Sequence, residues 1–451
     1  MTPSITFYFQ VHQPYRLRDL RITEIGKGEA KYFDAQKNRG VFRKVAEKCY
    51  LPANRLMLDL LERYSNFRIA YSLSGVFLEQ CEEYGQDVLE SFRALAKTGR
   101  VEFLGETYYH SLSCLKSLPE FCRQVRMHCR AIERKFGQRP TVFRNTELIY
   151  NNELALIARV LGFRGILAEG TDRLLGNRSA NEPFTPPDFP LRPEQEQIIN
   201  RERWMPPSDQ IHILLKNYRL SDDVAFRFSD RSWVGYPLHA DTFTDWLMAT
   251  GGHSINLFMD YETFGEHQWE DTGIFEFLRA LPRIWDERGI ATTTPSEVIA
   301  RWQGASQTYD AHDFISWADT ERDLSAWQGN RIQRSALDAL YGLEDLVERS
   351  HSEELAKMWG RLQTSDHFYY MCTKYWNDGD VHKYFSPYDS PYEAYRRYSH
   401  ALCDLRERLN ETIKIQDTRN KEESQSANGY SLNSFFKKMF GSCFLHLGSS
   451  R

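Results

Sequence analysis

The sequence lacks the features of a membrane-spanning, exported or disulfide-stabilised protein. Among its 451 residues, 26% are charged, and no apolar run approaches the ~20 residues that a membrane-spanning helix needs. The N-terminus has neither a basic region nor a small-residue cleavage site, so it indicates a first β-strand and not an export signal. The eight cysteines form no CxxC pair, which favours reduced thiols. We expect a cytoplasmic protein of two domains without stable membrane insertion.

Basic clusters and metal-ligand spacings are also missing. The net charge is −5, and no basic run is interleaved with aromatic residues, which argues against nucleic acid as a partner. The histidines and cysteines of residues 110–129 lack the spacing of metal ligands, so we expect no metal site among them: His110, Cys114, Cys122, His128 and Cys129. Aromatic residues are abundant, with 10 Trp, 24 Tyr and 28 Phe. They suit a filled core and also a cleft that stacks on sugar rings.

Strand-like runs alternate with helical patterns up to about residue 304. The expected strands cover 5–11, 67–74, 100–106, 141–147, 165–170, 211–216 and 254–260, with one more short strand at 291–297. A polar, proline-containing insertion at 171–205 predicts a surface loop over the strand ends. Strands separated by helices imply an α/β domain over 1–304 with a parallel sheet, closed or nearly closed into a barrel.

The pattern changes after about residue 305, where helical periodicity dominates 319–349, 352–376 and 391–414. This predicts an α-helical domain over 305–415. The final segment, 416–451, is polar at first and then carries an aromatic run, and we expect it to be a disordered tail. A short amphipathic helix that touches a membrane is the alternative for that segment.

Two of the expected strands end in carboxylates. The buried run 254–260 ends in Asp260, and the strand that precedes the helix at 152–161 ends in Glu147. The loops after parallel strands open on one face, so the two acids can meet there. One acid could attack or stabilise a sugar cation while the other protonates the leaving oxygen, which is the minimum for splitting a glycosidic bond. Helix caps and solvated loop acids are the ordinary alternative.

Several ordered motifs resemble the sequence regions of glycoside hydrolase family 57. They are Val11-His12-Gln13-Pro14, Gly99-Arg100-Val101-Glu102, Phe143-Arg144-Asn145-Thr146-Glu147, Met259-Asp260-Tyr261-Glu262-Thr263-Phe264-Gly265 and Thr294-Pro295-Ser296-Glu297. The segments 363–371 and 378–382 also resemble the C-terminal helical domain of the α-amylase-like members. The resemblance therefore extends from residue 5 to about 415 and omits the tail.

This resemblance implies an incomplete TIM-like (β/α)7 barrel followed by an α-helical bundle, and activity on α-glucans with retention of configuration. Carried over position by position, Glu147 matches the catalytic nucleophile and Asp260 the general acid/base. Retention needs their carboxyl groups ~5–5.5 Å apart. We expect a raised pKa for Asp260, because ionised Glu147 repels its charge and apolar neighbours surround it: Phe258, Phe264 and Trp269.

The resemblance also implies substrate-binding residues at the barrel mouth. His12 matches the histidine that lines the glucose site nearest the scissile bond, and Gln10 stands where many members carry a further histidine. Glu102 matches the acid of the second region. Glu106 is its competitor, because an even spacing places both on one face of a strand.

Further candidates each have an ordinary structural alternative. Trp233 could offer a stacking platform or cover a core edge, and Glu262 and His267 could support Asp260 or be solvated. Asp366 and His367 could touch sugar, although an interdomain or helix-surface contact is favoured for them.

We predict a retaining α-amylase that cuts internal α-1,4 bonds through a covalent glycosyl-enzyme intermediate, without a cofactor or metal. A 4-α-glucanotransferase or glucan branching enzyme with the same carboxylate pair is the nearest alternative. A non-catalytic glucan-binding protein would not need both acids. Deacetylase-like metal chemistry would need a His/Asp triad, and the sequence has no HxxxH-type pair to supply one.

Overall fold

The strands form two sheets in which nearly all pairings are parallel. A computed structural model describes residues 3–302, 304, 307–374 and 384–440, with side chains described as far as residue 422. One sheet has the order β3 (Val101–Phe103), β2 (Ile69–Leu73), β1 (Ser4–Val11) and β8 (Ser254–Asp260). The other has the order β4 (Val142–Arg144), β5 (Gly165–Glu169), β7 (His212–Lys216), β6 (Phe184–Thr185) and β9 (Gln307–Thr308).

The two sheets meet at both of their sides. Beyond the end of β3, Gly105 forms a parallel bridge with Phe143 of β4, and its amide donates to the Val142 carbonyl at 2.9 Å. On the other side, the Asn256 amide group of β8 donates to the Leu215 carbonyl of β7 at 2.9 Å. The parallel strands therefore follow one another around the molecule, and their C-terminal ends lie on one side.

Alternation along the strands sorts side chains into an inner and an outer layer. On β1, Ile5, Phe7 and Phe9 pack outward in the main apolar cluster with helix residues such as Met57 and Trp285. Tyr8 points inward and packs in a smaller cluster with Leu167, Leu214 and Phe258. Strands buried on both faces need near-continuous apolar sequence, which explains runs such as Ile5–Phe9.

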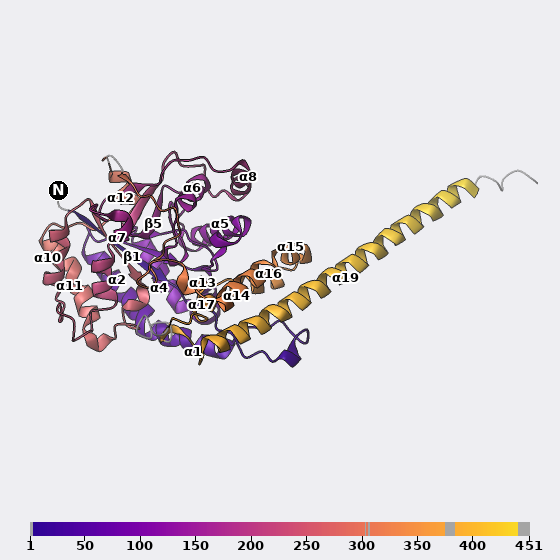
Figure 1. The fold of residues 1–451 in the computed structure, drawn as a ribbon, viewed down its shortest axis with the longest axis horizontal. Helices are drawn as coiled ribbons and strands as arrows, with labels where there is room; N and C mark the ends of the chain where they lie inside the picture. Colours follow the sequence, from indigo (N-terminus) through magenta and orange to yellow (C-terminus); the bar gives the residue numbers. More distant parts are fainter. Residues whose placement is uncertain (1–2, 303, 305–306, 375–383, 441–451) are drawn as a thin grey trace, which may run out of the picture.

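Helices cover the outside of the strands (Figure 1). Before residue 302 they are α1 (Ala35–Val45), α2 (Leu51–Arg63), α3 (Gly75–Tyr84), α4 (Gln86–Lys97), α5 (Leu118–Phe136), α6 (Asn152–Leu161), α7 (Asp172–Leu175), α8 (Pro193–Glu202), α9 (Tyr218–Ala225), α10 (Ala240–Thr250), α11 (Ile274–Glu287) and α12 (Pro295–Arg301). Local sequence signals set the bounds of α5. Ser117 caps its first turn, and Gly137, in the left-handed region at φ 70°, ends it.

After residue 324 the described chain is helical, as the periodicity predicts. The helices are α13 (Ser325–Gln328), α14 (Arg331–Tyr341), α15 (Glu344–Ser350), α16 (Glu353–Leu362), α17 (Ser365–Tyr369) and α19 (Pro391–Phe440). They share their own apolar cluster, which includes Trp327, Leu337, Trp359 and Tyr398. Figure 1 shows α14, α15 and α16 beside α19, away from the strands, and the far part of α19 extends beyond the rest of the molecule.

Three segments differ from the predictions. The insertion 171–205 is not a plain loop, because it contains α7, β6 and α8. At 291–297, Thr292 makes only a single bridge to Ile5, and a capping box between Thr294 and Glu297 then starts α12. Residues 416–440 continue α19, whereas a disordered tail was expected from 416. These residues include many helix-forming Lys, Glu, Arg and Gln, and α19 is already established before them.

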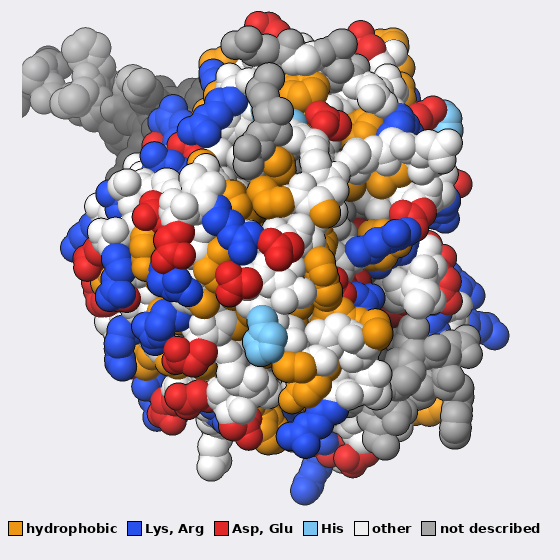
Figure 2. All heavy atoms as spheres, turned by 90° about the vertical axis from the view of Figure 1, so that its left-hand side faces the viewer, with side chains coloured by type: hydrophobic (Ala, Val, Ile, Leu, Met, Phe, Trp, Pro, Cys, Tyr) orange, Lys and Arg blue, Asp and Glu red, His pale blue; other side chains and the backbone are white. Residues whose placement is uncertain are grey.

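Two remaining expectations concern the motif at 378–382 and the absence of a membrane-spanning helix. The segment 378–382 lies outside the described residues. Within the described part of the chain, no helix combines the length and apolar character needed to cross a membrane. On the face shown in Figure 2, basic and acidic side chains are interspersed, which agrees with the nearly balanced charge of the sequence.

Candidate active site

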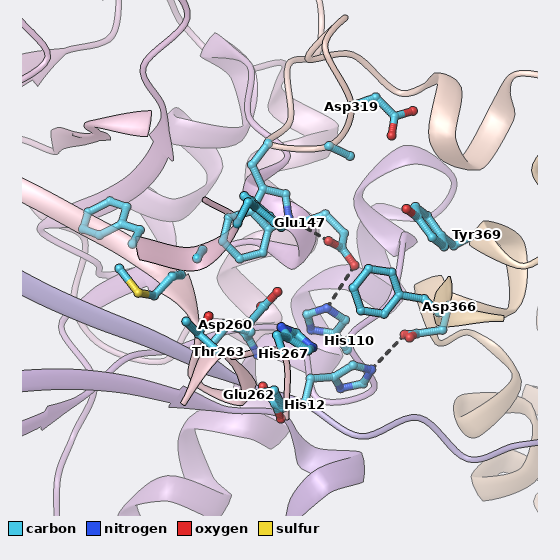
Figure 3. A pocket seen from close by; sticks show the side chains of 18 of the residues that line it. His12, His110, Glu147, Asp260, Glu262, Thr263, His267, Asp319, Asp366 and Tyr369 are labelled. Carbon is cyan, nitrogen blue, oxygen red and sulfur yellow. Dashed lines mark hydrogen bonds and ion pairs between the residues drawn. The ribbon is translucent and has the colours of Figure 1, made fainter. Parts of the chain in front are cut away.

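A pocket of about 480 Å³ lies at the C-terminal ends of the strands (Figure 3). Its walls include side chains from the ends of β1, β7 and β8 and from the turn after β4, and the segments after residue 316 complete it. Gln10, near the end of β1, lies beside Asp260, at the end of β8. Each is two positions after an inward-pointing residue, Tyr8 or Phe258, so both side chains point inward as well. Inward alternation therefore delivers polar groups to the pocket directly above the inner apolar cluster.

Glu147 lies in a short turn, Thr146–Leu148, directly after β4, with its backbone in the left-handed region at φ 57°. Its Oε2 accepts a hydrogen bond from Trp317 Nε1 at 2.8 Å. Its Oε1 accepts from Ser365 Oγ at 3.1 Å and faces His110 Nε2 at 3.4 Å. Burial opposes ionisation, but the hydrogen bond and charge of His110 and the charge of Arg144 hold the pKa of Glu147 below its usual value. Glu147 is therefore ionised near neutral pH.

Asp260 ends β8 and has the opposite tendency. Burial and the negative charge of Glu147 raise the pKa of Asp260 to about 6, while Arg144 opposes this rise. The expected apolar setting is confirmed only for Phe258, which lines the pocket. Phe264 packs in the outer cluster, and Trp269 is largely exposed. One pocket thus holds one ionised carboxylate and one carboxyl group that keeps its proton to higher pH.

The loop after Asp260 contributes Glu262 and His267 to the pocket wall. Burial and the charge of Asp260 raise the pKa of Glu262 to about 8, and the Tyr50 hydroxyl donates to its Oε1. Burial lowers the pKa of His267 to about 4, so its ring is neutral near pH 7. Gly265 shapes this loop at φ 110°, where a Cβ atom would collide with the Lys48 carbonyl.

His12 joins the strands to the later helices. Its Nδ1 lies 2.7 Å from Ser74 Oγ, and its Nε2 lies 2.8 Å from Asp366 Oδ2. Burial opposes ionisation of Asp366, but the neighbouring His12 and His110 hold the pKa of this carboxyl well below its usual range. Asp366 therefore contacts His12, directly after β1, and it also lines the pocket.

Gln10 also lies in the pocket wall, and Glu106 lies behind it. Gln10 Oε1 accepts hydrogen bonds from the Tyr8 hydroxyl at 2.9 Å and from Ser72 Oγ at 2.8 Å. Glu106 is fully buried, and its Oε2 lies 3.1 Å from His110 Nδ1. Glu106 therefore contacts two residues of the pocket wall, His110 and Gln10, but does not itself line the pocket.

Glu102 does not line this pocket, although the sequence predicted a contact with substrate. Its Cα lies in register with Ala70, in the layer of Tyr8, below the ends of the strands. Its Oε2 accepts from the Ser296 backbone amide at 3.0 Å, at the start of α12. An even spacing predicts that Glu102 and Glu106 point to the same face of the strand. It does not say that Glu102 lies within β3 and Glu106 beyond its end, closer to the pocket.

Trp233 and His367 are also absent from the pocket wall. Trp233 packs edge to face on Trp246, with ring centroids 6.0 Å apart, in the outer apolar cluster. The alternative of a cover over a core edge therefore holds for Trp233. His367 is buried with its ring beside Tyr398, and its Nε2 lies 3.3 Å from the Arg361 carbonyl.

The structure brings together most of the predicted site and adds groups that the sequence did not indicate. The predicted residues that line the pocket are Gln10, His12, Glu147, Asp260, Glu262, His267 and Asp366. The added groups all contact Glu147: His110 and Trp317 also line the pocket, and Ser365 bonds to Glu147 without lining the pocket. We considered His110 in the sequence only as a possible metal ligand. Within the described residues, no group of three or more His, Cys, Asp or Glu side chains is placed to hold a metal ion.

Comparison with known proteins gives consistent matches. The model of glycosyl hydrolase family 57 matches residues 6–311. A Methanocaldococcus jannaschii protein named "Putative alpha-amylase" is 44% identical over 422 residues, which are 91% of this chain and 85% of that protein. A Thermococcus kodakarensis protein named 4-alpha-glucanotransferase is 26% identical over 148 residues, 33% of this chain and 22% of that protein.

A solved structure shares the fold at low sequence identity. It is a branching enzyme of the same family from Thermococcus kodakaraensis, in complex with glucose. The superposition has a TM-score of 0.64 and covers 92% of this chain and 94% of that chain, at 15% identity.

Proposed function

The chain belongs to glycosyl hydrolase family 57, and from this premise we propose that it is an α-amylase that cleaves internal α-1,4 bonds of glucans with retention of configuration. One observation carries the proposal. Glu147 and Asp260 line the same pocket, and their surroundings favour an ionised Glu147 and a protonated Asp260. A retaining glycosidase needs this division of roles between two carboxyl groups.

The first chemical step uses both groups at once. A Glu147 oxygen attacks the anomeric carbon, and the bond from that carbon to the glycosidic oxygen breaks while Asp260 gives its proton to the departing oxygen. The product is a glycosyl ester on Glu147. We place the two carboxyl groups ~5–5.5 Å apart in this reaction, as direct attack requires.

The second step returns the enzyme to its starting state. A water molecule loses a proton to the Asp260 carboxylate as its oxygen attacks the anomeric carbon. The bond between that carbon and Glu147 breaks, and its electron pair goes back to the Glu147 carboxylate. A sugar hydroxyl in place of water would give transfer, which is the activity named for the glucanotransferase relative.

The other pocket residues suit a chain of glucose units. Gln10, His12, Glu262, His267 and Asp366 present hydrogen-bonding groups to sugar hydroxyls. Aromatic side chains also line the pocket and can stack on the apolar faces of the sugars: Phe226, Trp317, Tyr369 and Phe385. The substrate in this proposal is an α-glucan or malto-oligosaccharide, without a metal or organic cofactor.

We also propose the finer architecture that the family implies. The closed succession of parallel strands supports an incomplete (β/α)7 barrel over 1–304, and the separate apolar cluster supports a helical bundle over 305–415. The short segment before α13 begins with β9, which pairs with β6 at the edge of the sheet, and then reaches the strand ends, where Trp317 meets Glu147. The bundle domain in this proposal therefore contributes to the site.

Product analysis on maltoheptaose tests the proposed activity. Wild type should give only shorter oligosaccharides, and Glu147→Gln, which keeps the size of the side chain but cannot form the ester, should give none. Longer linear products would instead indicate a 4-α-glucanotransferase, and new α-1,6 bonds a branching enzyme. If wild type were as inactive as Glu147→Gln on every α-glucan and still bound glycogen, a non-catalytic binding protein would replace the proposal.

A further inference from the structure

His110 lies between two carboxylates. Its Nδ1 is 3.1 Å from Glu106 Oε2, and its Nε2 is 3.4 Å from Glu147 Oε1. An ionised carboxylate only accepts hydrogen bonds, so both contacts are made together only when both ring nitrogens carry protons. Burial would lower the pKa of His110, but its hydrogen bonds to Glu106 and Glu147 raise that pKa to about 9. Geometry and charge therefore both favour an imidazolium.

The surroundings hold this ring in one orientation. Glu106 has no exposed surface, and its backbone amide donates to His128 Nδ1 at 3.1 Å. The His110 ring stacks on the His12 ring, with centroids 4.0 Å apart and an interplanar angle of 21°. Both His110 and Glu147 have left-handed backbones, at φ 51° and 57°. Such conformations are uncommon for these residues and persist where the surrounding structure fixes them.

The hydrogen bonds to Glu147 distinguish its two oxygens. Oε1 has two donors, His110 and Ser365, whereas Oε2 has one, Trp317. Each carboxylate oxygen offers about two lone-pair directions. Among the described residues, donors therefore fill both directions of Oε1 and only one direction of Oε2, whose other direction is open to the substrate.

We propose that Oε2 is the attacking atom of Glu147, and that His110, oriented by Glu106, acts with Ser365 on Oε1 to speed the breakdown of the glycosyl ester. This inference rests on the proposed function. During the first step the negative charge on Glu147 is lost as the bond from Oε2 to the anomeric carbon forms. During the second step that bond breaks and the charge returns to the carboxylate, where the two donors on Oε1 stabilise it.

The proposal assigns opposite effects to the two steps. Donors on Oε1 withdraw electron density from Glu147, so they make it a weaker nucleophile but a better leaving group. Removing them should slow the second step far more than the first. The ester should then accumulate, which a loss of general structural integrity would not produce.

Maltosyl fluoride is a suitable probe, because fluoride leaves without a proton from Asp260. In His110→Gln and Ser365→Ala we expect a burst of fluoride equal to the enzyme concentration, followed by slow turnover. The steady-state rate should fall about 100-fold for His110→Gln, the scale for losing a charge-stabilising donor, and about 10-fold for Ser365→Ala. Mass spectrometry should find a maltosyl adduct on the peptide that contains Glu147.

Ser350→Ala is the matched control. Ser350 is also a buried serine of the helical region, and its Oγ donates to the Val347 carbonyl away from the pocket. It should show wild-type kinetics. Thermal denaturation of each variant identifies any that fails to fold. If His110→Gln does not fold, Ser365→Ala and Glu106→Gln still carry the test.

Glu106→Gln gives a readout that only the proposed role predicts. Removing this negative charge should lower the pKa of His110, so the variant should lose the imidazolium at a lower pH than wild type does. Breakdown of the ester should then approach the wild-type rate at low pH and fall as pH rises. The other titratable groups that act on or with His110 stay in place: His12, His128, Glu147, Asp260 and Asp366. Loss of the Glu106 charge also lowers the pKa of His12 and His128, so both rings become less able to carry a proton in its place.

The outcomes separate this inference from the proposed function. If the burst and the turnover slow equally in His110→Gln and Ser365→Ala, and no adduct accumulates, the role assigned to Oε1 is wrong while the amylase proposal stands. If wild type and Glu147→Gln release fluoride at the same rate, the proposed function itself fails.

Discussion

The strand region and the region after residue 306 contribute different things to one pocket. The strand region, residues 3–302, supplies Glu147 and Asp260, the groups proposed to react. The later region supplies donors and a counter-charge: Trp317 and Ser365 bond to Glu147, and Asp366 bonds to His12. The later region is therefore part of the site, because it sets the orientation and ionisation of groups that the strands deliver.

The sequence separations explain why one contribution is easier to recognise than the other. Trp317 and Ser365 lie 170 and 218 positions from Glu147, and Asp366 lies 354 positions from His12. A carboxylate at a strand end is visible in a local pattern. A donor that reaches it from a distant loop or short helix is not.

Asp260→Asn tests the strand region's share and should have the largest effect. Asparagine cannot supply the proton, so turnover of maltoheptaose should fall by about 1,000-fold. In wild type, activity should decline as pH rises through about 6, the pKa of Asp260, because the acid must be protonated. Asp260→Asn should lose this alkaline decline, which a pH–rate profile measures.

Two comparisons control the Asp260→Asn measurement. The variant should keep a fast burst of fluoride from maltosyl fluoride, whose leaving group needs no proton, and then turn over slowly because no carboxylate takes the proton from water in the second step. Asp245→Asn, a change at an exposed aspartate paired with Arg288, should leave the profile unchanged. An alkaline limb that survives in Asp260→Asn would assign the proton to another group.

Trp317→Phe tests the later region's share. It removes the hydrogen bond to Glu147 Oε2 but keeps an aromatic ring beside Arg144, whose guanidinium lies 4.9 Å from the ring centroid. We expect turnover to fall about 10-fold, the scale of one hydrogen bond to a charged group. Loss of the donor raises the pKa of Glu147, so the acid limb of the pH–rate profile should move to higher pH.

Trp327→Phe is the matched control for Trp317→Phe. Trp327 is a fully buried tryptophan of the same region, and its Nε1 has no hydrogen-bond partner among the described residues. Its loss should change neither turnover nor the pH profile. Equal effects of the two changes would mean that the later region acts only through stability.

Arg144 should produce a smaller and different change, because it acts on both acids. Arg144 is two positions after the inward-pointing Val142, so its side chain also points inward, and it is fully buried. None of its guanidinium nitrogens has a hydrogen-bond partner among the described residues. Its charge lowers the pKa of both Glu147 and Asp260. In Arg144→Met, both limbs of the pH–rate profile should therefore move to higher pH.

Thermal denaturation makes the Arg144→Met test more discriminating. Because Arg144 is a counter-charge to buried carboxylates, its loss should lower the melting temperature more at neutral pH, where Glu147 is ionised, than at low pH. A melting temperature lowered equally at both pH values, together with unmoved pH limbs, would contradict an electrostatic role and indicate a structural one.

Much of the fold could be predicted because strand and helix periods are local properties of the sequence. The strands at 5–11, 165–170 and 254–260 are confirmed within a residue or two. The strand predicted at 100–106 is shorter in the structure, Val101–Phe103, because the chain leaves the sheet after a bridge at Gly105. This difference is what moves Glu106 beyond the strand and against residues of the pocket wall.

The rest of the site could not be predicted because it depends on height, backbone conformation and distant contacts. Alternation predicts that the Glu102 side chain points to the inner face of the strands. It does not predict that Glu102 lies level with Tyr8, below the pocket. The left-handed backbone of His110, which accompanies its position beside Glu147, has no signal such as a glycine. Trp233 has the composition of a sugar platform, yet its contact with Trp246 makes it part of the outer apolar cluster.

The smallest expected effect on activity comes from Glu102, which lies in the inner layer of the strands but outside the pocket wall. Its Oε2 accepts from the Ser296 amide in the first turn of α12, a contact that resembles an N-terminal cap. Glu102→Ala should leave turnover and product pattern unchanged and reduce the free energy of unfolding by about 1 kcal/mol. Urea denaturation and maltoheptaose assays measure the two quantities, and Glu102→Gln, which keeps an acceptor oxygen, should restore most of the stability. A large loss of turnover in both variants, with stability intact, would return Glu102 to the substrate site and blur the division between reacting groups at the strand ends and structural groups below them.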